Sequence, residues 1–154
     1  MAGRIESRLK ELGIVLPTPP APVASYVPTA ASGNLVFVSG QITSTAEGLK
    51  YVGVVGRDLS VEDGKAAARL CAVNLVAQIK AACGDLDRVK RCVKITVFVN
   101  AAPDFTQHPE VANGASDLLV EIFGEAGKHA RAALGAGSLP RGVACEVEAL
   151  FEIA

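Results

Sequence analysis

The segment VKRCVKITVFVN, residues 89–100, constrains the fold more than any other part of this sequence. Apolar and polar side chains alternate along it, and successive residues of a strand point to opposite faces of a sheet. The apolar set consists of Val89, Val93, Ile95, Val97 and Val99. This pattern predicts a central strand with one buried face, which needs neighbouring strands beside it and a layer of structure over it.

Two helical segments are predicted to form that layer. Ser60 is a favourable N-cap for VEDGKAAARLCAVNLVAQIKAAC, residues 61–83, a segment rich in alanine and straight-chain residues that ends at Gly84. Pro109 suits the first turn of a second helix. The apolar stripe of that helix consists of Val111, Ala115, Leu118 and Ile122.

The first 24 residues are predicted to form an N-terminal helix and a stiff connector. Ile5, Leu9 and Leu12 recur at helical spacing, and Gly13 is a suitable end for the helix. Prolines dominate residues 17–22, and they favour an extended polyproline conformation over a place in a sheet. Residues 25–154 are then expected to form one domain around one core.

The remaining segments predict an α+β sandwich with one sheet and two helices on one of its faces. Turn residues and apolar runs predict strands at SYVPTA, NLVFVSG and KYVGVV, and two more at about 130–137 and 143–153. The order of elements lacks the regular alternation of a doubly wound fold. In the last strand Val143, Cys145, Val147, Phe151 and Ile153 share the face predicted to meet the helices. Glu146 and Glu148 lie on the other face, which therefore meets either solvent or another subunit.

The composition argues against several classes of partner. A formal net charge of −1 provides no overall field for nucleic acid or an anionic membrane. The charged N-terminal residues do not resemble a signal peptide, and no run approaches the roughly 18 apolar residues of a membrane span. We therefore expect a cytoplasmic protein with no nucleic-acid or membrane partner.

Cysteine and histidine do not predict a metal or redox site. The four cysteines lie far apart with no CxxC pair, so they are interpreted as buried, reduced thiols. They are Cys71, Cys83, Cys92 and Cys145. His108 and His129 have no nearby serine or cysteine that the sequence would nominate as a nucleophile, and both are interpreted as loop residues.

Arg131 and Glu146 are the main candidates for function because each is charged in a segment otherwise composed of small and apolar residues. A hairpin centred between Ser138 and Leu139 would place them opposite each other on one face. A turn centred on Pro140 would instead shift the register by about three residues. If the two residues lie close together, the guanidinium could hold a carboxylate or phosphate while the glutamate polarises a water. The alternative is that they form only a surface ion pair.

Four other residues could line a pocket near this pair. Ser39 and Gly40 offer a hydroxyl and an unobstructed backbone N–H at the end of a strand, although a glycine ending a strand is common. Tyr26 could cover a pocket or simply occupy a strand. Asn113, in the first turns of the second helix, could be a donor in the site or a partner for the local backbone.

Three ordered segments resemble the YjgF/RidA family, also carried under the label endoribonuclease L-PSP. SYVPTAASGNLVFVSGQIT resembles the family's first Tyr-containing strand and its Ser-Gly-Gln strand, and CVKITVFVNAAPDF resembles its central strand. HARAALGAGSLPRGVACEVEA resembles its C-terminal signature. The sequence departs from the active members at His129 and Ala133, where they commonly have Pro and Cys. The N-terminal helix also marks a divergent branch.

The resemblance implies a chorismate-mutase-like fold, a homotrimer, and a site at each subunit interface. It implies a hydrolase that converts reactive enamines and imines to 2-oxo acids and ammonia, without a cofactor. In that role Arg131 would bind the substrate carboxylate and Glu146 would orient the attacking water. The pocket would be lined by Tyr26, Ser39, Gly40 and Asn113. The match of Asn113 to the family pattern requires a one-residue gap in the alignment. The alternatives are a non-catalytic binder of small carboxylates and, from the label alone, an endoribonuclease or translation inhibitor.

Overall fold

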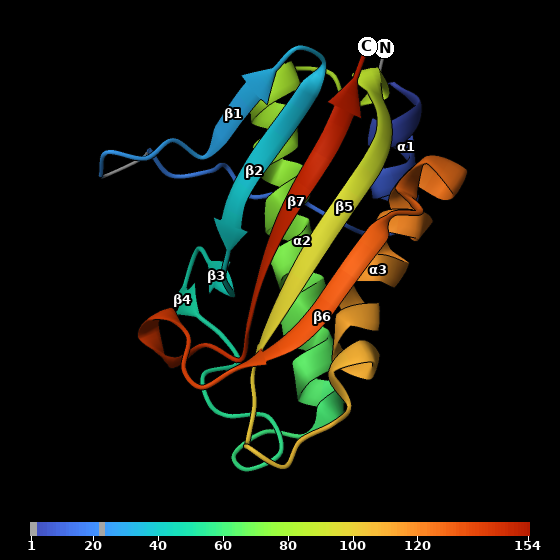
Figure 1. The fold of residues 1–154 in the computed structure, drawn as a ribbon. Coiled ribbons are helices and arrows are strands. Elements are labelled where there is room, and N and C mark those ends of the chain that lie inside the picture. Colours follow the sequence, from blue (N-terminus) through green and yellow to red (C-terminus); the bar gives the residue numbers. More distant parts are fainter. Residues whose placement is uncertain (1–2, 22–23) are drawn as a thin grey trace.

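The computed structural model describes residues 3–21 and 24–154, and a five-stranded sheet covered on one face by two helices forms its centre (Figure 1). The strand order is β1-β2-β7-β5-β6, with only β5 and β6 parallel. The strands are β1 (Thr29–Ser32), β2 (Leu35–Gln41), β5 (Val89–Asn100), β6 (Ala130–Ala136) and β7 (Cys145–Ile153). The covering helices are α2 (Val61–Cys83) and α3 (His108–Phe123). The predicted α+β architecture is therefore confirmed.

Local sequence explains the two covering helices. Ser60 and Asp63 form a reciprocal capping box at the start of α2, with each backbone N–H donating to the other side chain at 3.1 Å. Gly84 ends α2 at a φ of 80°, which favours glycine. By length and composition α2 could cross a membrane, but 61% of its most apolar stretch is buried within the protein, as expected for a core helix. The predicted apolar stripe of α3 is fully buried.

The N-terminal helix α1 (Arg4–Glu11) packs against α3 and a short 3₁₀ turn, η1 (Leu86–Arg88). Ile5 and Leu9 are buried, as their helical spacing predicted. Asp87 caps this helix, because its carboxylate accepts hydrogen bonds from the backbone N–H groups of Arg4 and Ile5, both at 2.9 Å. These two bonds lower the pKa of Asp87. Part of the predicted connector, residues 22–23, lies outside the described residues.

The predicted third strand, KYVGVV, is wrong. Tyr51 and Gly53 both have positive φ values, 52° and 143°, which interrupt extended pairing. The segment instead makes isolated bridges at Val52 and Val55. Two shorter strands, β3 (Ser44–Thr45) and β4 (Gly48–Leu49), pair just before it. The first strand also begins later than predicted, at Thr29, directly after Pro28, which has no N–H to donate.

Most of the predicted burial pattern of β5 is confirmed, with one correction. Ile95, Val97 and Val99 are completely buried, but Val93 is only partly buried and Cys92 takes its place in the core. The pairing of β5 with β7 shifts between Cys92 and Lys94, as it does at a β-bulge. The extra residue reverses the alternation on one side of the irregularity. All four cysteines are free and buried, as predicted.

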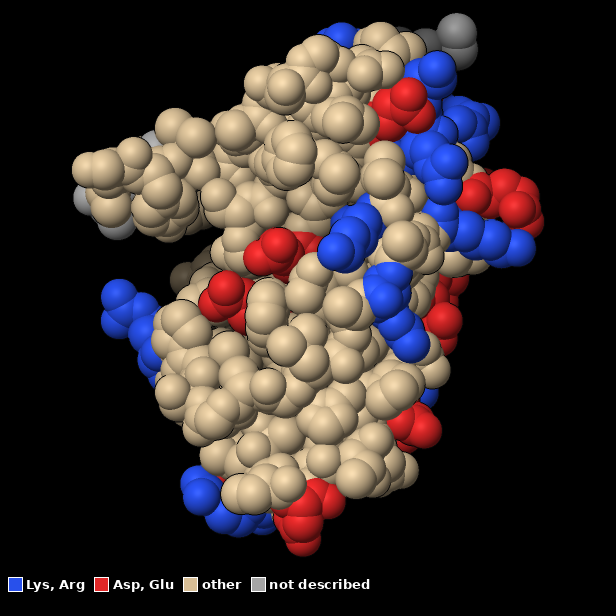
Figure 2. Space-filling model, in the orientation of Figure 1, with Lys and Arg blue, Asp and Glu red and all other residues tan. Residues whose placement is uncertain are grey.

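The face of the sheet opposite the helices is open and carries exposed apolar side chains. Phe37 on β2 is 49% exposed and Leu134 on β6 is 40% exposed. Figure 2 shows this face as a broad uncharged area interrupted by a few acidic and basic groups. Such a surface is typical of an interface rather than of a face that meets only water.

Candidate functional site

Glu146 lies on the open face of β7, directly over Gly40. It pairs with Phe98 across β5, while the next residue, Val147, pairs with Gln41 of β2. The register shifts between Val38 and Gln41, and this irregularity brings Gly40 under the carboxylate. A Cβ atom on Gly40 would lie 3.0 Å from Cδ of Glu146 and closer still to Oε2. Only a residue without a side chain leaves the carboxylate in this position, and the structure brings two of the predicted site residues together.

Burial raises the pKa of the Glu146 carboxyl group, and the negative charge of Glu148 raises it further. Both glutamates lie on the same face of β7, since they are two residues apart. None of the ion pairs formed within residues 3–21 and 24–154 involves Glu146. A half-buried carboxylate without a neutralising partner is suited to accept and return a proton.

Ser39 fixes the chain segment that carries Tyr26. Its hydroxyl donates to the carbonyl of Val27 at 2.8 Å, and its backbone N–H donates to the carbonyl of Pro28 at 2.9 Å. Tyr26 itself is 59% exposed, and Val27 is 54% exposed. The hydroxyl proton of Ser39 is therefore already used, and Tyr26 projects into solvent rather than covering a pocket of its own chain.

Arg131 lies on β6 at the edge of the sheet, on the side that faces the helices. Its strand partner Ile95 is completely buried beneath them. The guanidinium reaches α3, where Nη1 donates to Oδ1 of Asn113 at 2.8 Å and to Oγ of Ser116 at 3.1 Å. The structure thus brings together Arg131 and Asn113, both of which the sequence analysis singled out.

Neither of the two hairpins considered for the last two strands forms, so Arg131 and Glu146 do not meet within one chain. Strand β5 lies between β6 and β7. Arg131 pairs with Ile95 and Glu146 with Phe98, which places the two side chains on opposite faces. Two strand spacings and three residues along the strand separate their Cα atoms by roughly 14 Å. The helix α3 is responsible, because it returns the chain to form a parallel neighbour of β5, as crossover helices do.

One pair of residues beside Arg131, Ser116 and His129, was not predicted from the sequence to belong to the site. Oγ of Ser116 lies 2.8 Å from Nε2 of His129, whose Nδ1 lies 2.6 Å from the carbonyl oxygen of Gly127. Burial lowers the pKa of His129, and the positive charge of Arg131 lowers it further, against the opposing effect of the Gly127 bond. His129 does lie in a loop, as predicted, but it is half-buried, whereas the same prediction for His108 is wrong because that residue begins α3. The signal that could have found Ser116 is its position three residues after Asn113, on the same helix face.

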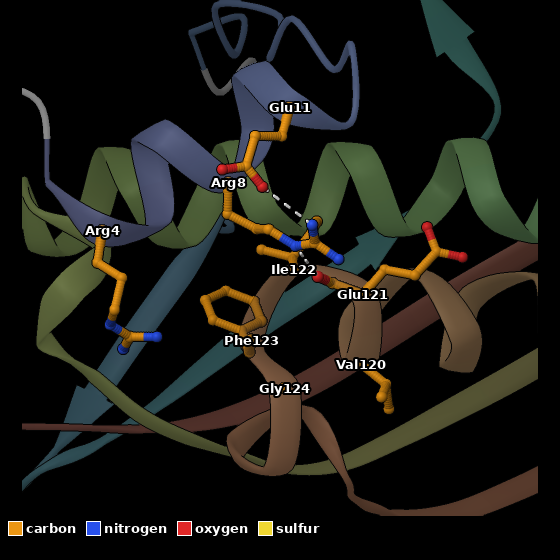
Figure 3. A pocket seen from close by; sticks show the side chains of 8 residues that line it. All are labelled: Arg4, Arg8, Glu11, Val120, Glu121, Ile122, Phe123 and Gly124. Atoms are coloured by element: carbon orange, nitrogen blue, oxygen red, sulfur yellow. Dashed lines mark hydrogen bonds and ion pairs between the residues drawn. The ribbon is translucent and has the colours of Figure 1, made fainter.

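A cavity between α1 and α3 lies away from all of these groups. It has a volume of about 330 Å³ and separates α1 from the end of α3 (Figure 3). Arg8 crosses it, donating to the carbonyl of Glu121 at 2.8 Å and pairing with Glu11 at 3.1 Å. These bonds have a structural explanation, because a basic side chain satisfies the last carbonyl groups of a helix. A second cavity, of about 240 Å³, lies between β3–β4 and α2.

The predicted site residues therefore form two half-sites on an isolated chain. One consists of Glu146, Gly40 and Ser39 on the open face, and the other of Arg131 and Asn113 at the edge of the sheet. In the described part of the chain, no three His, Cys, Asp or Glu side chains gather as metal ligands do. Chemically, the first half-site can handle a proton and the second can bind a carboxylate.

Comparisons with known proteins agree with this architecture. The chain is 50% identical to "Protein TCP17" from Trypanosoma cruzi over 153 residues, which cover 99% of this chain and 96% of the relative. A Shewanella oneidensis structure labelled "a putative endoribonuclease" is 38% identical and superposes with a TM-score of 0.94, covering 98% of this chain and all of its own. Escherichia coli TdcF, solved with bound serine, is 25% identical with a TM-score of 0.64, covering 89% and 94%.

A family model matches nearly the whole chain. It covers residues 6–153 and is described as "YjgF/chorismate_mutase-like, putative endoribonuclease". The match includes both half-sites and all five strands of the central sheet. On this evidence, the chain belongs to the YjgF/chorismate-mutase-like family.

Proposed function

We propose that this protein hydrolyses small 2-imino acids and their enamine tautomers, such as 2-aminoacrylate, to 2-oxo acids and ammonia. The observation that carries the proposal is the Glu146 carboxylate, half-buried against Gly40 with a raised pKa. The raised pKa makes this carboxylate a stronger base than an ordinary glutamate and suits it to exchange a proton with a substrate. Arg131, held at the sheet edge by Asn113, provides the complementary group for a substrate carboxylate.

The proposed reaction requires the protein mainly to position the substrate and a water molecule. The oxygen of a water bonds to the carbon of the protonated imine while Glu146 takes a proton from that water. Glu146 then passes this proton to the nitrogen of the resulting carbinolamine. Glu146, ionised again, takes the hydroxyl proton, and the carbonyl group forms as the carbon–nitrogen bond breaks and ammonia leaves with the bonding electron pair. Because an iminium carbon is already electrophilic, holding the carboxylate and aiming the water can supply much of the acceleration.

A complete site requires a second copy of the chain in this proposal. Arg131 and Glu146 point to opposite faces, so one subunit's β6 edge must approach the open face of its neighbour. In a homotrimer, each interface would combine Arg131 of one subunit with Glu146 of the next. The exposed apolar side chains of Phe37 and Leu134 support an interface on this face.

The serine bound to TdcF also supports a small amino-acid-like ligand. Serine shares with a 2-imino acid a carboxylate beside a carbon that carries nitrogen. A non-catalytic carboxylate binder is the second candidate, because the Arg131 and Asn113 half-site would suit binding alone. Only the endoribonuclease label favours a nuclease, and a formal net charge of −1 gives no general attraction to RNA.

An assay of ammonia release tests the proposal. 2-Aminoacrylate generated in situ by a serine dehydratase should lose ammonia faster in the presence of the wild-type protein, and both Arg131→Ala and Glu146→Gln should remove this acceleration. Arg91→Ala is the matched control, because this exposed arginine lies on the neighbouring strand β5, four residues before Ile95, the strand partner of Arg131. Thermal protection by pyruvate without any turnover would favour the binder, and cleavage of RNA would favour the nuclease.

A further inference from the structure

Arg131 needs support if it is to bind a ligand in a fixed direction. It is an exposed side chain on an edge strand, and an arginine loses considerable rotamer entropy when it is ordered. Both of its contacts come from α3, where Asn113 and Ser116 are three residues apart and share one helix face. The two acceptors use the two hydrogens of Nη1.

The pattern of these contacts determines which part of the guanidinium is free. An arginine has five N–H groups, of which Nη1 carries two. With both committed to α3, the Nε and Nη2 groups are left on the opposite edge. Those two groups form the parallel fork that binds a carboxylate through two hydrogen bonds. The contacts to α3 therefore select the edge that a ligand meets.

His129 determines how Ser116 contacts Arg131. The Gly127 carbonyl can only accept, so Nδ1 of His129 carries the hydrogen of that 2.6 Å bond. In the neutral ring Nε2 is then an acceptor, and the Ser116 hydroxyl donates to it at 2.8 Å. This leaves a lone pair of Ser116 facing the N–H of Arg131, 3.1 Å away. Every donor in the series has one acceptor.

We propose that Ser116 and His129 are positioning residues that hold Arg131 with its Nε and Nη2 edge toward the substrate carboxylate. The direction of this hydrogen-bond series, from Arg131 through Ser116 and His129 to the Gly127 carbonyl, is its physical basis. The inference rests on the proposed function, because it assigns a role to groups that support the carboxylate-binding arginine. Neither residue touches the substrate in this role.

Two matched pairs of variants test the proposal. His129→Gln keeps an acceptor near the position of Nε2, whereas His129→Asn keeps a donor near Nδ1 and loses that acceptor. Ser116→Thr keeps the hydroxyl, and Ser116→Ala removes it. We expect Ser116→Ala and His129→Asn to weaken pyruvate binding and raise the KM for 2-aminoacrylate by about three- to tenfold, since one charge-assisted bond is lost while Asn113 remains. The kcat should change by less than about twofold, and the conservative variants should behave as wild type.

A second measurement separates this inference from the proposed function. The order parameter of the Arg131 Nε–H group, from ¹⁵N relaxation, should be high in the wild type and fall in Ser116→Ala and His129→Asn. An unchanged order parameter in folded variants would overturn the positioning role. If the order falls as expected but wild type and Arg131→Ala show equal turnover and equal pyruvate binding, the positioning role stands and the proposed function fails.

Discussion

Gly40→Ala should separate activity from stability at the candidate site. The added Cβ would lie 3.0 Å from Cδ of Glu146 and closer to Oε2, compared with 3.4–4 Å for an ordinary contact. The carboxylate is the end of a flexible side chain, so it should swing aside by on the order of 1 Å, and a displacement of that size can reduce a reaction rate by about 10²-fold. The backbone of Gly40 is not left-handed, so alanine can adopt it. The free energy of unfolding should therefore change by less than about 1 kcal/mol.

The assay compares ammonia release from 2-aminoacrylate with the urea unfolding curve of each protein. Gly137→Ala is the matched control, because its Cβ would have no atom within 4 Å and its backbone is not left-handed. We expect Gly137→Ala to retain full activity. Gly40→Ala with wild-type stability and wild-type activity would refute the reasoning that the position of Glu146 determines the rate.

Three further predictions concern charge and assembly. Glu146→Gln should raise the free energy of unfolding at pH 7, because a raised folded-state pKa means that ionised Glu146 disfavours the fold. The gain in stability should vanish as the pH falls below 4.5, where the carboxyl group is protonated in the unfolded chain as well. Urea titrations at several pH values can measure this change. The pKa of His129 is lowered in the folded protein, so on acidification this side chain is protonated in the unfolded chain before it is protonated in the folded one. The free energy of unfolding should therefore fall as the pH drops below 6.5. It should fall less in His129→Gln than in the wild type between pH 7.5 and 5.5. Leu134→Asp places a charge on the open face, where Leu134 is 40% exposed, and should convert the proposed homotrimer to monomers in light scattering without unfolding them.

Features determined by nearby residues were predicted well from the sequence. Ser60 and Gly84 mark the ends of α2, because capping depends on residues within one turn of the helix. The burial of Ile95 and Val97 followed from simple alternation. The position of Glu146 on the open face also required only the local alternation of β7.

Long-range pairing could not be predicted in the same way. Nothing local to Arg131 specifies that β6 pairs with β5 instead of with β7, and that choice reverses the face on which the arginine lies. The contact of Gly40 with Glu146 depends on a register shift between two strands far apart in sequence. The role of His129 likewise depends on Ser116, which packing brings to it from another element.

Mixing two inactive variants provides the most direct test of a shared site between subunits. Arg131→Ala retains a functional Glu146, and Glu146→Gln retains a functional Arg131. When the two chains are unfolded together in equal amounts and reassembled, each interface receives its arginine from one subunit and its glutamate from another. Random assembly in a closed ring should then make about a quarter of the interfaces native. We predict ammonia release at about a quarter of the wild-type rate, whereas a mixture as inactive as its two components would contradict a site shared by Arg131 and Glu146.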